Sequence, residues 1–338
     1  MVRIVSNRER IKTVSWQIVH EWEEDFAEGL QSEMIFQCEE KKNLIEKIRY
    51  HHAFVKYIPL VKTGNTRIVF HMTAPYEFNW FSSPDYIPVI IDAWKQDLER
   101  IQQFCMYNKI VFLGSQEAVS ELRKRNMENV HYLPVSISKR YKRTYVPDKD
   151  IDLIMFGRNH LVLNKWVDQL EKNTSLHVVR CRQDNTGDFC AWSNKTGFLG
   201  VINQRIELMN LIGRSHYTTV SSAGNDLENE FDLQRTGGYS PVTPRFFEAA
   251  VNYSVGIGIF PNNDDYNICN IKMASININT YEEFKDRISE KPDYNKVKSV
   301  FDLFLEQHWT EQRLAEIVRQ AYAIFPEQDF LFNIINKK

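Results

Sequence analysis

A glycine-rich loop followed by a helix start, residues 237–250, is the segment whose residue types point most directly to chemistry. It reads GGYSPVTPRFFEAA, in which Thr243 is a favourable N-cap and Pro244 suits the first helical position. The N–H groups and dipole of a helix start favour an anion, and Gly237 and Gly238 let a ligand come close to the backbone. The segment therefore predicts a phosphate-binding loop.

Arg245 and Glu248 follow in the predicted helix, three residues apart and thus on one face. This spacing places a cation near the helix start and a carboxylate acceptor one turn further on, which suits a phosphate beside a hydroxyl-bearing group. A nucleotide sugar carries both groups. The same pattern also fits an ordinary loop-to-helix junction with a solvated face, so the choice depends on the rest of the chain.

Length and composition describe a globular chain. With 338 residues, 43% of them hydrophobic and 25% charged, it is long enough for two domains of roughly 150 residues each. A formal net charge of −2 argues against a nucleic-acid partner, and no run approaches the ~20 apolar residues of a membrane span. Because the N-terminus has no apolar signal-peptide core, we expect a cytoplasmic protein.

Strand-length apolar runs alternate with helical patterns along both halves of the chain. Helices are predicted at about 14–30, 94–107, 206–212 and 310–323, with one more from 244; strands are predicted at 2–5, 67–72, 88–92, 109–114, 130–135, 152–157, 176–180, 217–220 and 255–260. Repeated strand-then-helix order predicts an α/β protein with two Rossmann-like parallel-sheet domains facing each other across a cleft.

A polar segment from Ser136 to Asp150 is the best candidate for a linker between the two domains. We expect the domains at residues 1–140 and 147–317, with a C-terminal tail of about 318–338 that can pack on the first. The basic cluster at 138–143 fits a solvated linker, or peripheral contact with anionic lipid.

Candidate ligand-binding residues follow several predicted strands. In open parallel sheets, ligands collect at the carboxyl ends of strands. Gly157 and Arg158 follow one strand of the second half, Arg180 follows the next, and Ser222 follows a later one. The sequence therefore predicts that these residues converge with Arg245 at one edge of a sheet.

Six short motifs follow one another between residues 110 and 285. They are Leu-Gly-Ser at 113–115, Tyr-Leu-Pro at 132–134, Phe-Gly-Arg at 156–158, Phe-Leu-Gly at 198–200, Val-Ser-Ser at 220–222 and Thr-Pro-Arg-Phe-Phe-Glu-Ala at 243–249. In this order and spacing the chain resembles glycosyltransferases of GT-B fold, especially the family-4-like and spore-maturation-type transferases.

The resemblance implies that the second domain binds a nucleotide-diphosphate sugar and the first domain an acceptor. Gly157 would let the diphosphate approach, Arg245 would bind phosphate or close the fold, and Glu248 would accept hydrogen bonds from the ribose. Arg180 would lie near the base, and Lys165 is the nearest match to the family's second basic residue. The full set of expected donor-binding residues is Gly157, Arg158, Lys165, Arg180, Ser222, Gly237, Gly238, Ser240, Arg245, Phe246 and Glu248.

Two positions depart from the family's pattern. Ser240 stands where many retaining members carry a glutamate, and Tyr253 stands where a glycine usually ends the motif helix, although Asn252 beside it tolerates a left-handed turn. These departures keep two alternatives open besides a glycosyltransferase. One is a non-catalytic nucleotide- or sugar-binding protein of the same fold, and the other is a sugar-nucleotide epimerase.

Asp92 and His71 are the candidates for a catalytic base that deprotonates the acceptor hydroxyl, because both fall at predicted strand ends of the first half. Each also has a structural interpretation, His71 as a core residue and Asp92 as a helix cap. If configuration is retained, Arg158 and Arg245 would carry more of the catalysis by stabilising the leaving diphosphate.

No metal and no cofactor are expected beyond the nucleotide sugar itself. Asp148, Asp150 and Asp152 alternate, but they lead into a strand instead of following one, and the five cysteines are scattered without metal-ligand spacing. We thus expect a hexosyltransferase-like, metal-independent enzyme of polysaccharide biosynthesis whose acceptor is a glycan, a lipid-linked sugar or a protein. The sequence gives neither the donor, nor the stereochemistry, nor the oligomeric state.

Overall fold

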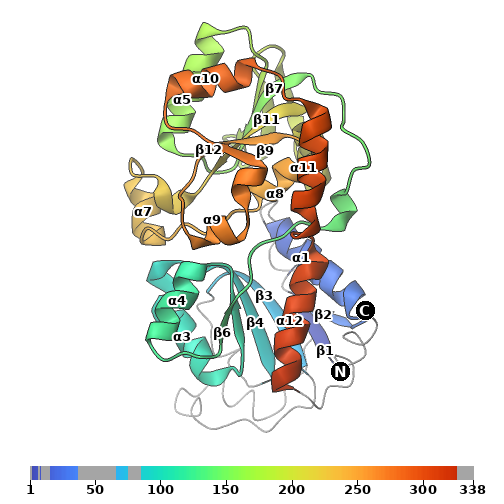
Figure 1. Cartoon of the computed structure of the whole chain (residues 1–338), viewed down its shortest axis with the longest axis vertical. Coiled ribbons are helices and arrows are strands. Elements are labelled where there is room, and N and C mark those ends of the chain that lie inside the picture. The colour runs from blue at the N-terminus through green and yellow to red at the C-terminus, as the bar shows by residue number, and fades with distance from the viewer. Residues whose placement is uncertain (1, 7, 9–15, 37–65, 75–84, 326–338) are drawn as a thin grey trace. The chain divides into compact units, whose positions relative to one another are not determined.

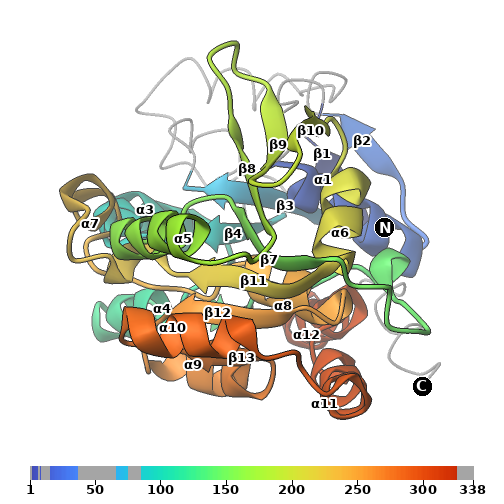
Figure 2. The same cartoon turned by 90° about the horizontal axis from the view of Figure 1, so that it is seen from above.

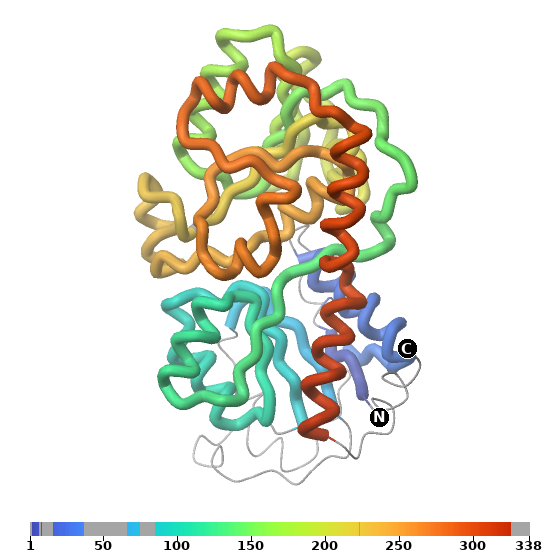
Figure 3. Tube along the Cα trace, viewed as in Figure 1, coloured from blue at the N-terminus to red at the C-terminus, as the bar shows by residue number. Residues whose placement is uncertain are grey.

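The computed structural model describes residues 2–6, 8, 16–36, 66–74 and 85–325. The chain divides into two compact units, which are described separately (Figures 1 and 3). Unit 1 contains residues 1–134 and 310–338, and unit 2 contains residues 135–309. None of the helices in the described part of the chain is both long and apolar enough to cross a membrane.

Unit 1 is built on a parallel sheet of six strands in the order β2-β1-β3-β4-β5-β6. The strands are β1 (Val2–Ser6), β2 (Met34–Phe36), β3 (Thr66–Thr73), β4 (Tyr86–Asp92), β5 (Val111–Leu113) and β6 (Val130–Tyr132). Strands β3 and β4 are almost continuously buried, as expected for the centre of a sheet that is covered on both faces.

In the described part of unit 1, helices cover both faces of the sheet. Helices α1 (Gln17–Gly29) and α12 (Thr310–Ile324) pack against each other on one face, and α3 (Leu98–Tyr107) and α4 (Gln116–Lys124) lie on the other (Figure 1). Ser115 is the N-cap of α4, because its hydroxyl accepts a hydrogen bond from the backbone N–H of Ala118.

Unit 2 contains a seven-stranded sheet in the order β10-β9-β8-β7-β11-β12-β13. The strands are β7 (Ile151–Phe156), β8 (Val178–Gln183), β9 (Phe189–Ser193), β10 (Gly197–Val201), β11 (Ser215–Ser221), β12 (Val255–Ile259) and β13 (Ser275–Asn277). Six strands run in one direction, and β9 alone runs the opposite way, in antiparallel ladders with β8 and with β10. The sequence did not predict this hairpin.

Helices cover both faces of the sheet of unit 2 (Figure 2). Helices α5 (Leu161–Asn173) and α10 (Tyr281–Ser289) lie on one face, and α6 (Arg205–Gly213) and α8 (Arg245–Val251) on the other, with α11 (Tyr294–Glu306) packed against α8. Two short helices, α7 (Glu230–Thr236) and α9 (Asp264–Ile268), lie in the connections around β12. The predicted α/β class with two parallel-sheet units is thereby confirmed.

The strand order of unit 2 reverses at β7. From β7 the chain moves outward to β8, β9 and β10, and then returns to place β11 on the other side of β7. The carboxyl ends of β7 and β11 therefore flank a topological switch point, which is where open α/β sheets leave a crevice for ligands.

The polar segment predicted to be a linker is part of unit 2. Arg143 donates a hydrogen bond from Nε to Asn252 Oδ1 at 2.8 Å, and Lys149 donates from Nζ to the Asn252 carbonyl at 2.8 Å. Burial, together with the nearby Arg143 charge, lowers the pKa of Lys149 to about 7. These side chains bind the segment to unit 2, whereas Lys139, Arg140 and Lys142 of the basic cluster are exposed.

Candidate functional site

Gly157 and Arg245 mark the switch point of unit 2. Gly157 directly follows β7 and has a φ of +65°, in the left-handed region that glycine adopts without strain. A Cβ at Gly157 would lie 3.7 Å from Cδ of Arg245. The sharp turn therefore lets the arginine side chain run alongside the backbone at the end of β7.

The Arg245 guanidinium joins the ends of β7 and β11. Its Nη2 donates to the Ser221 carbonyl at 3.0 Å, and its Nη1 donates to Asn159 Oδ1 at 3.2 Å and to the Phe156 carbonyl at 3.4 Å. Desolvation by burial lowers the pKa of Arg245 to about 10, so the guanidinium stays charged at neutral pH. Arg245 thus closes the fold and also provides a positive charge at the switch point.

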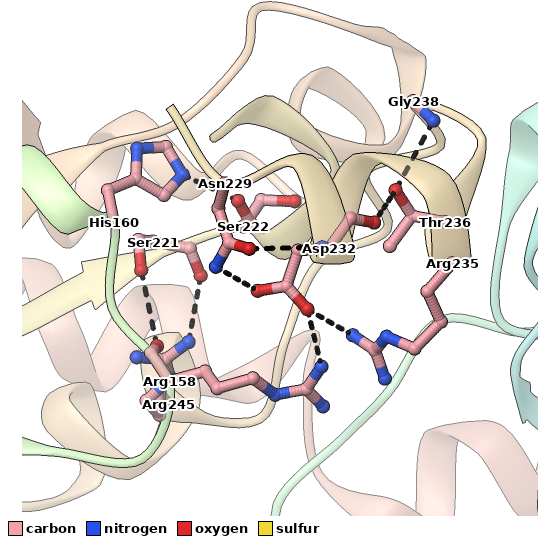
Figure 4. A network of polar contacts seen from close by, with 10 residues as sticks. All are labelled: Arg158, His160, Ser221, Ser222, Asn229, Asp232, Arg235, Thr236, Gly238 and Arg245. Carbon is pink, nitrogen blue, oxygen red and sulfur yellow. Dashed lines mark hydrogen bonds and ion pairs between the residues drawn. The ribbon is translucent and has the colours of Figure 1, made fainter. Parts of the chain in front are cut away.

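Arg158 lies beside this group and meets a carboxylate from α7 (Figure 4). Its Nη1 is 3.2 Å from Asp232 Oδ1, and Arg235 Nη2 is 3.1 Å from the same oxygen. The other oxygen, Oδ2, accepts a hydrogen bond from Asn229 Nδ2 at 3.0 Å. The side chain of Arg158 is 55% exposed, whereas that of Asp232 is 6% exposed, so the carboxylate is the fixed member of the cluster.

The N-terminus of α5 already has a carboxylate. Asp226 Oδ2 accepts a hydrogen bond from the Leu161 N–H at 2.9 Å. The preceding residue, His160, has Nε2 at 2.6 Å from the Ser222 carbonyl, to which it donates, and burial lowers the pKa of His160. A carboxylate of the protein itself therefore accepts from the first N–H of α5, at the end where the helix dipole favours negative charge.

The glycine-rich loop differs from the phosphate-binding loop that the sequence predicted. The N–H of Gly237 bonds to the Leu233 carbonyl, the N–H of Gly238 to Thr236 Oγ1, and the N–H of Tyr239 to the Thr236 carbonyl. Gly237 has a φ of +62° and ends α7, as glycine often does at a helix C-terminus. These amides satisfy the end of α7 and are not turned toward a ligand.

The predicted helix start after this loop is also different in detail. Pro244 is the N-cap of α8 and no side chain caps the helix, so the expected capping role of Thr243 is wrong. Helix α8 has only seven residues, so its dipole alone does not indicate an anion site. The helix predicted from residue 244 is confirmed as α8, and its first residue, Arg245, reaches the end of β7.

Glu248 is buried in unit 2. Its Oε1 lies 2.5 Å from Arg205 Nη2 at the start of α6, and the two side chains are 4% and 7% exposed. Phe246 is also fully buried, with its ring edge-on to Phe260 and Tyr266. The helix that carries Arg245 is therefore fixed by an internal ion pair and an aromatic cluster.

Three other predicted donor-binding residues lie apart from the arginine cluster or inside the protein. Lys165 on α5 is exposed and paired with Glu228 at 2.7 Å. Arg180 lies within β8, where it pairs with Asp168 and Glu171 of α5, so the prediction that it follows its strand is wrong. Ser240 is buried, and its carbonyl accepts a hydrogen bond from Asn263.

The two candidate bases lie in unit 1. His71 is buried within β3, its ring 6.3 Å from that of Phe104, and burial lowers its pKa to about 3. Asp92 is the last residue of β4, opposite Thr73 of β3, and is partly exposed. The placement of Asp92 at a strand end is thus as predicted, whereas His71 belongs to the core of the sheet.

The alternating aspartates do not converge. Asp150 accepts two hydrogen bonds from Arg214, and Asp152 accepts one from the N–H of His177. Within the described residues, no three His, Cys, Asp or Glu side chains come close enough together to hold a metal ion.

Sequence reasoning missed Asp232, Arg235 and Arg205. Asn229 caps α7 by accepting a hydrogen bond from the N–H of Asp232, so the Asn-x-x-Asp spacing could have revealed this helix start. Arg158 and Asp232 are 74 positions apart in the sequence, so a local sequence pattern could not predict their contact.

No protein-family model matches the sequence, and no curated protein sequence matches it. Solved structures do resemble it. AviGT4, a glycosyltransferase of avilamycin A biosynthesis, is 11% identical, with 96% of this chain and 98% of that chain covered and a TM-score of 0.52. Alr3699/HepE of Anabaena, solved in complex with UDP and glucose, is 8% identical, with 95% and 99% covered and a TM-score of 0.55. The chain therefore shares the GT-B fold of these proteins, as the sequence predicted.

Proposed function

We propose that this protein is a glycosyltransferase that moves a sugar from a nucleotide-diphosphate donor to an acceptor hydroxyl, with unit 2 binding the donor. The observation that carries the proposal is the Arg245 guanidinium, which joins the ends of β7 and β11 beside Gly157 and Arg158. A charged group held at a topological switch point is well placed to meet a diphosphate.

The chemistry follows from where negative charge develops. When the bond between the anomeric carbon and the diphosphate oxygen breaks, the electron pair leaves with the diphosphate, which gains negative charge. Arg158 and Arg245 supply positive charge at this point without reorganising, because hydrogen bonds within unit 2 hold both side chains. In this proposal guanidinium groups compensate the diphosphate, and no cofactor takes part in the transfer.

The two solved structures agree with this proposal in different ways. AviGT4 is a glycosyltransferase, and HepE was solved with a nucleoside diphosphate and a sugar together. Both cover nearly the whole of this chain and share its fold.

Unit 1 is proposed to bind the acceptor, and Asp92 is the stronger candidate for a base. It is partly exposed at the carboxyl end of β4, where a parallel sheet presents functional groups. His71 is buried against α3 and remains neutral at physiological pH. A glycan, a lipid-linked sugar and a protein all offer the hydroxyl that the reaction requires.

The first test is binding of UDP, GDP, ADP and CMP, followed by incubation with sugar conjugates of the nucleotide that binds. We expect one nucleotide to stabilise the protein, and donor consumption to release that nucleotide with the sugar transferred to an acceptor or to water. Arg158→Gln should weaken nucleotide binding because it removes a positive charge from the site. The variant should stay folded, because the side chain of Arg158 is 55% exposed. Failure of every nucleotide to bind would contradict the proposal, and conversion of the donor into an epimer would replace transfer by epimerisation.

A further inference from the structure

A nucleotide diphosphate carries at least two negative charges, so a site built on arginine side chains needs more than one phosphate-binding cation. The sequence indicated Lys165 as the second basic residue. In the structure Lys165 is 65% exposed and its Nζ lies 2.7 Å from Glu228 Oε2. This lysine already has a counter-ion on the surface, and it does not share a contact with Arg158.

Arg235 does share a contact with Arg158. Both guanidiniums donate to one oxygen atom, Asp232 Oδ1, at 3.2 Å for Arg158 and 3.1 Å for Arg235, as the dashed lines of Figure 4 show. The two cations come from separate elements, the turn after β7 and the last turn of α7. A single acceptor atom therefore brings two positive charges together at the switch point.

The carboxylate that holds them is itself fixed. Asn229 donates to Asp232 Oδ2 and accepts from the Asp232 N–H, so both ends of Asp232 are bound in the first turn of α7. Only 6% of the Asp232 side chain is exposed. The anchor is buried, whereas the side chain of Arg158 is 55% exposed and that of Arg235 is 23% exposed, so the two arginines are the charged side chains of the cluster that reach solvent.

The charges of this cluster sum to one positive charge, from two guanidiniums and one carboxylate. An ion pair confined to α7 would need only Arg235 and Asp232, which are three residues apart, and would contribute little by itself. The added convergence of Arg158 leaves the cluster with excess positive charge beside Arg245. Such an excess favours an anion with more than one charged group.

We propose that Arg235 is the second phosphate-binding cation of the donor site, and that Asp232 is a positioning residue that holds Arg235 and Arg158 at the spacing of a diphosphate. This assignment rests on the proposed function, because the ligand is the diphosphate of the nucleotide sugar. In this proposal α7 contributes a phosphate-binding side chain to the site, whereas the amides of the glycine-rich loop after it bond to the end of α7.

The test is calorimetric titration of the full-length protein with the nucleoside diphosphate that wild type binds most tightly among UDP, GDP and ADP, and with the matching monophosphate. Arg235→Gln should weaken diphosphate binding about tenfold or more and monophosphate binding by much less. Arg235→Lys should recover part of the loss because it keeps the charge but not the planar fork. Arg214→Gln, which removes an exposed arginine of the same unit paired with Asp150, should leave both affinities unchanged.

A double-mutant cycle tests the role of Asp232. If Asp232 acts through the arginine, the effects of Asp232→Asn and Arg235→Gln on diphosphate affinity will not add, and additivity would overturn the positioning role. Equal affinity of wild type and Arg235→Gln for the diphosphate would overturn the assignment of Arg235 while leaving the proposed function intact. Absence of binding by wild type itself would overturn the proposed function first. Thermal unfolding of each variant verifies that it is folded.

Discussion

Burial decides what a single charged residue can do in this protein, and Glu248 shows it most clearly. The resemblance to family-4-like transferases implies that this carboxylate binds ribose, yet in the structure it forms a buried ion pair with Arg205 at 2.5 Å. A pair of this kind is costly to break, because the partner that stays behind is a buried charge without compensation. Glu248 therefore has a structural task whatever else it contacts.

We predict that Glu248→Ala lowers the free energy of unfolding by about 3–5 kcal/mol, as measured by urea denaturation. The matched control is Glu121→Ala, which removes a carboxylate from a surface pair with Arg125 and should cost under about 1 kcal/mol. Similar small losses in the two variants would show that Arg205 finds another partner when Glu248 is removed.

His71 predicts how stability depends on pH. Its pKa is lowered from 6.5 to about 3 in the folded protein because burial disfavours the charged ring. Below pH 6.5 the His71 ring binds a proton in the unfolded chain but stays neutral in the folded protein. The free energy of unfolding present above pH 6.5 therefore decreases as the pH falls toward 3. The slope is about 1.4 kcal/mol per pH unit, or about 2 kcal/mol between pH 6.5 and pH 5.

The measurement is urea unfolding of wild type and His71→Leu at pH 7 and at pH 5. The variant should lose less stability between the two pH values, by about 2 kcal/mol. Other buried histidines, such as His160, contribute to the slope of both proteins equally. An equal loss of stability between pH 7 and pH 5 in the two proteins would mean that burial of neutral His71 does not cause the pH dependence.

How far the sequence predicts the site depends on the distance between partners along the chain. Arg245 was predicted because its position in a loop-to-helix motif is a local feature. Arg180 was misplaced because its strand extends to Gln183, which leaves the arginine in mid-strand against α5. The burial of Glu248 depends on Arg205, 43 positions away, and no spacing rule contains such a partner.

At the scale of elements, the switch point depends on how closely β11 and β12 approach. Gly258 in β12 is paired with Val220 of β11, and a Cβ at this position would overlap the Val220 carbonyl oxygen. Backbone atoms cannot move aside as a flexible side chain does. The strand that ends at Ser221, where Arg245 binds, therefore keeps its position only with glycine at 258.

Gly258→Ala should consequently destabilise unit 2 by more than the ~1 kcal/mol of an ordinary glycine substitution, and it should weaken nucleotide binding as well. Gly187→Ala is the control, because nothing lies within 4 Å of a Cβ there and its cost is limited to the strain of a φ of +91°. Thermal unfolding and nucleotide titration of both variants give the comparison. Equal behaviour would show that β12 can shift without loss.

Element ends were harder to predict than element types. The predicted left-handed turn after α8 exists, but Tyr253 adopts it with a φ of +53°, while Asn252 has a φ of −97°. The buried Tyr253 hydroxyl lies within hydrogen-bond distance of Asp302 and of the Arg143 carbonyl, at 2.7 and 3.1 Å. Tertiary contacts thus hold a tyrosine in a conformation that local preference assigns to asparagine or glycine.

In the whole molecule, the alternation of strands and helices was enough to predict two parallel-sheet units, whose borders lie after Pro134 and after Trp309. The polar segment at 136–150 has the composition of a linker but is bound to unit 2 by Arg143 and Lys149. Helix α12 follows α11 by only a few residues, yet it packs on α1, and Arg313 donates a hydrogen bond to the Pro134 carbonyl. The polar composition of a segment indicates that it is solvated, but it does not indicate which element packs against it.

The chain passes between the units twice, after Pro134 and after Trp309, and the two crossing segments pair where they enter unit 2. The N–H of Ile137 donates to the His308 carbonyl, and Ile137 forms a parallel bridge with Trp309. Both borders of unit 2 are thereby fastened to each other inside the unit itself. Residues 135–309 thus hold a complete sheet, its covering helices and every arginine assigned to the donor.

We therefore predict that a fragment of residues 135–309 folds alone and binds the same nucleoside diphosphate as the full chain, with an affinity within about tenfold. The reason is that Arg158, Arg235 and Arg245 keep all their described partners in the fragment. Circular dichroism and calorimetric titration make the comparison, and the fragment should lose glycosyl transfer because the acceptor unit is missing. A folded fragment that binds no nucleotide would mean that unit 1 contributes directly to the donor site, since nothing within unit 2 would have changed.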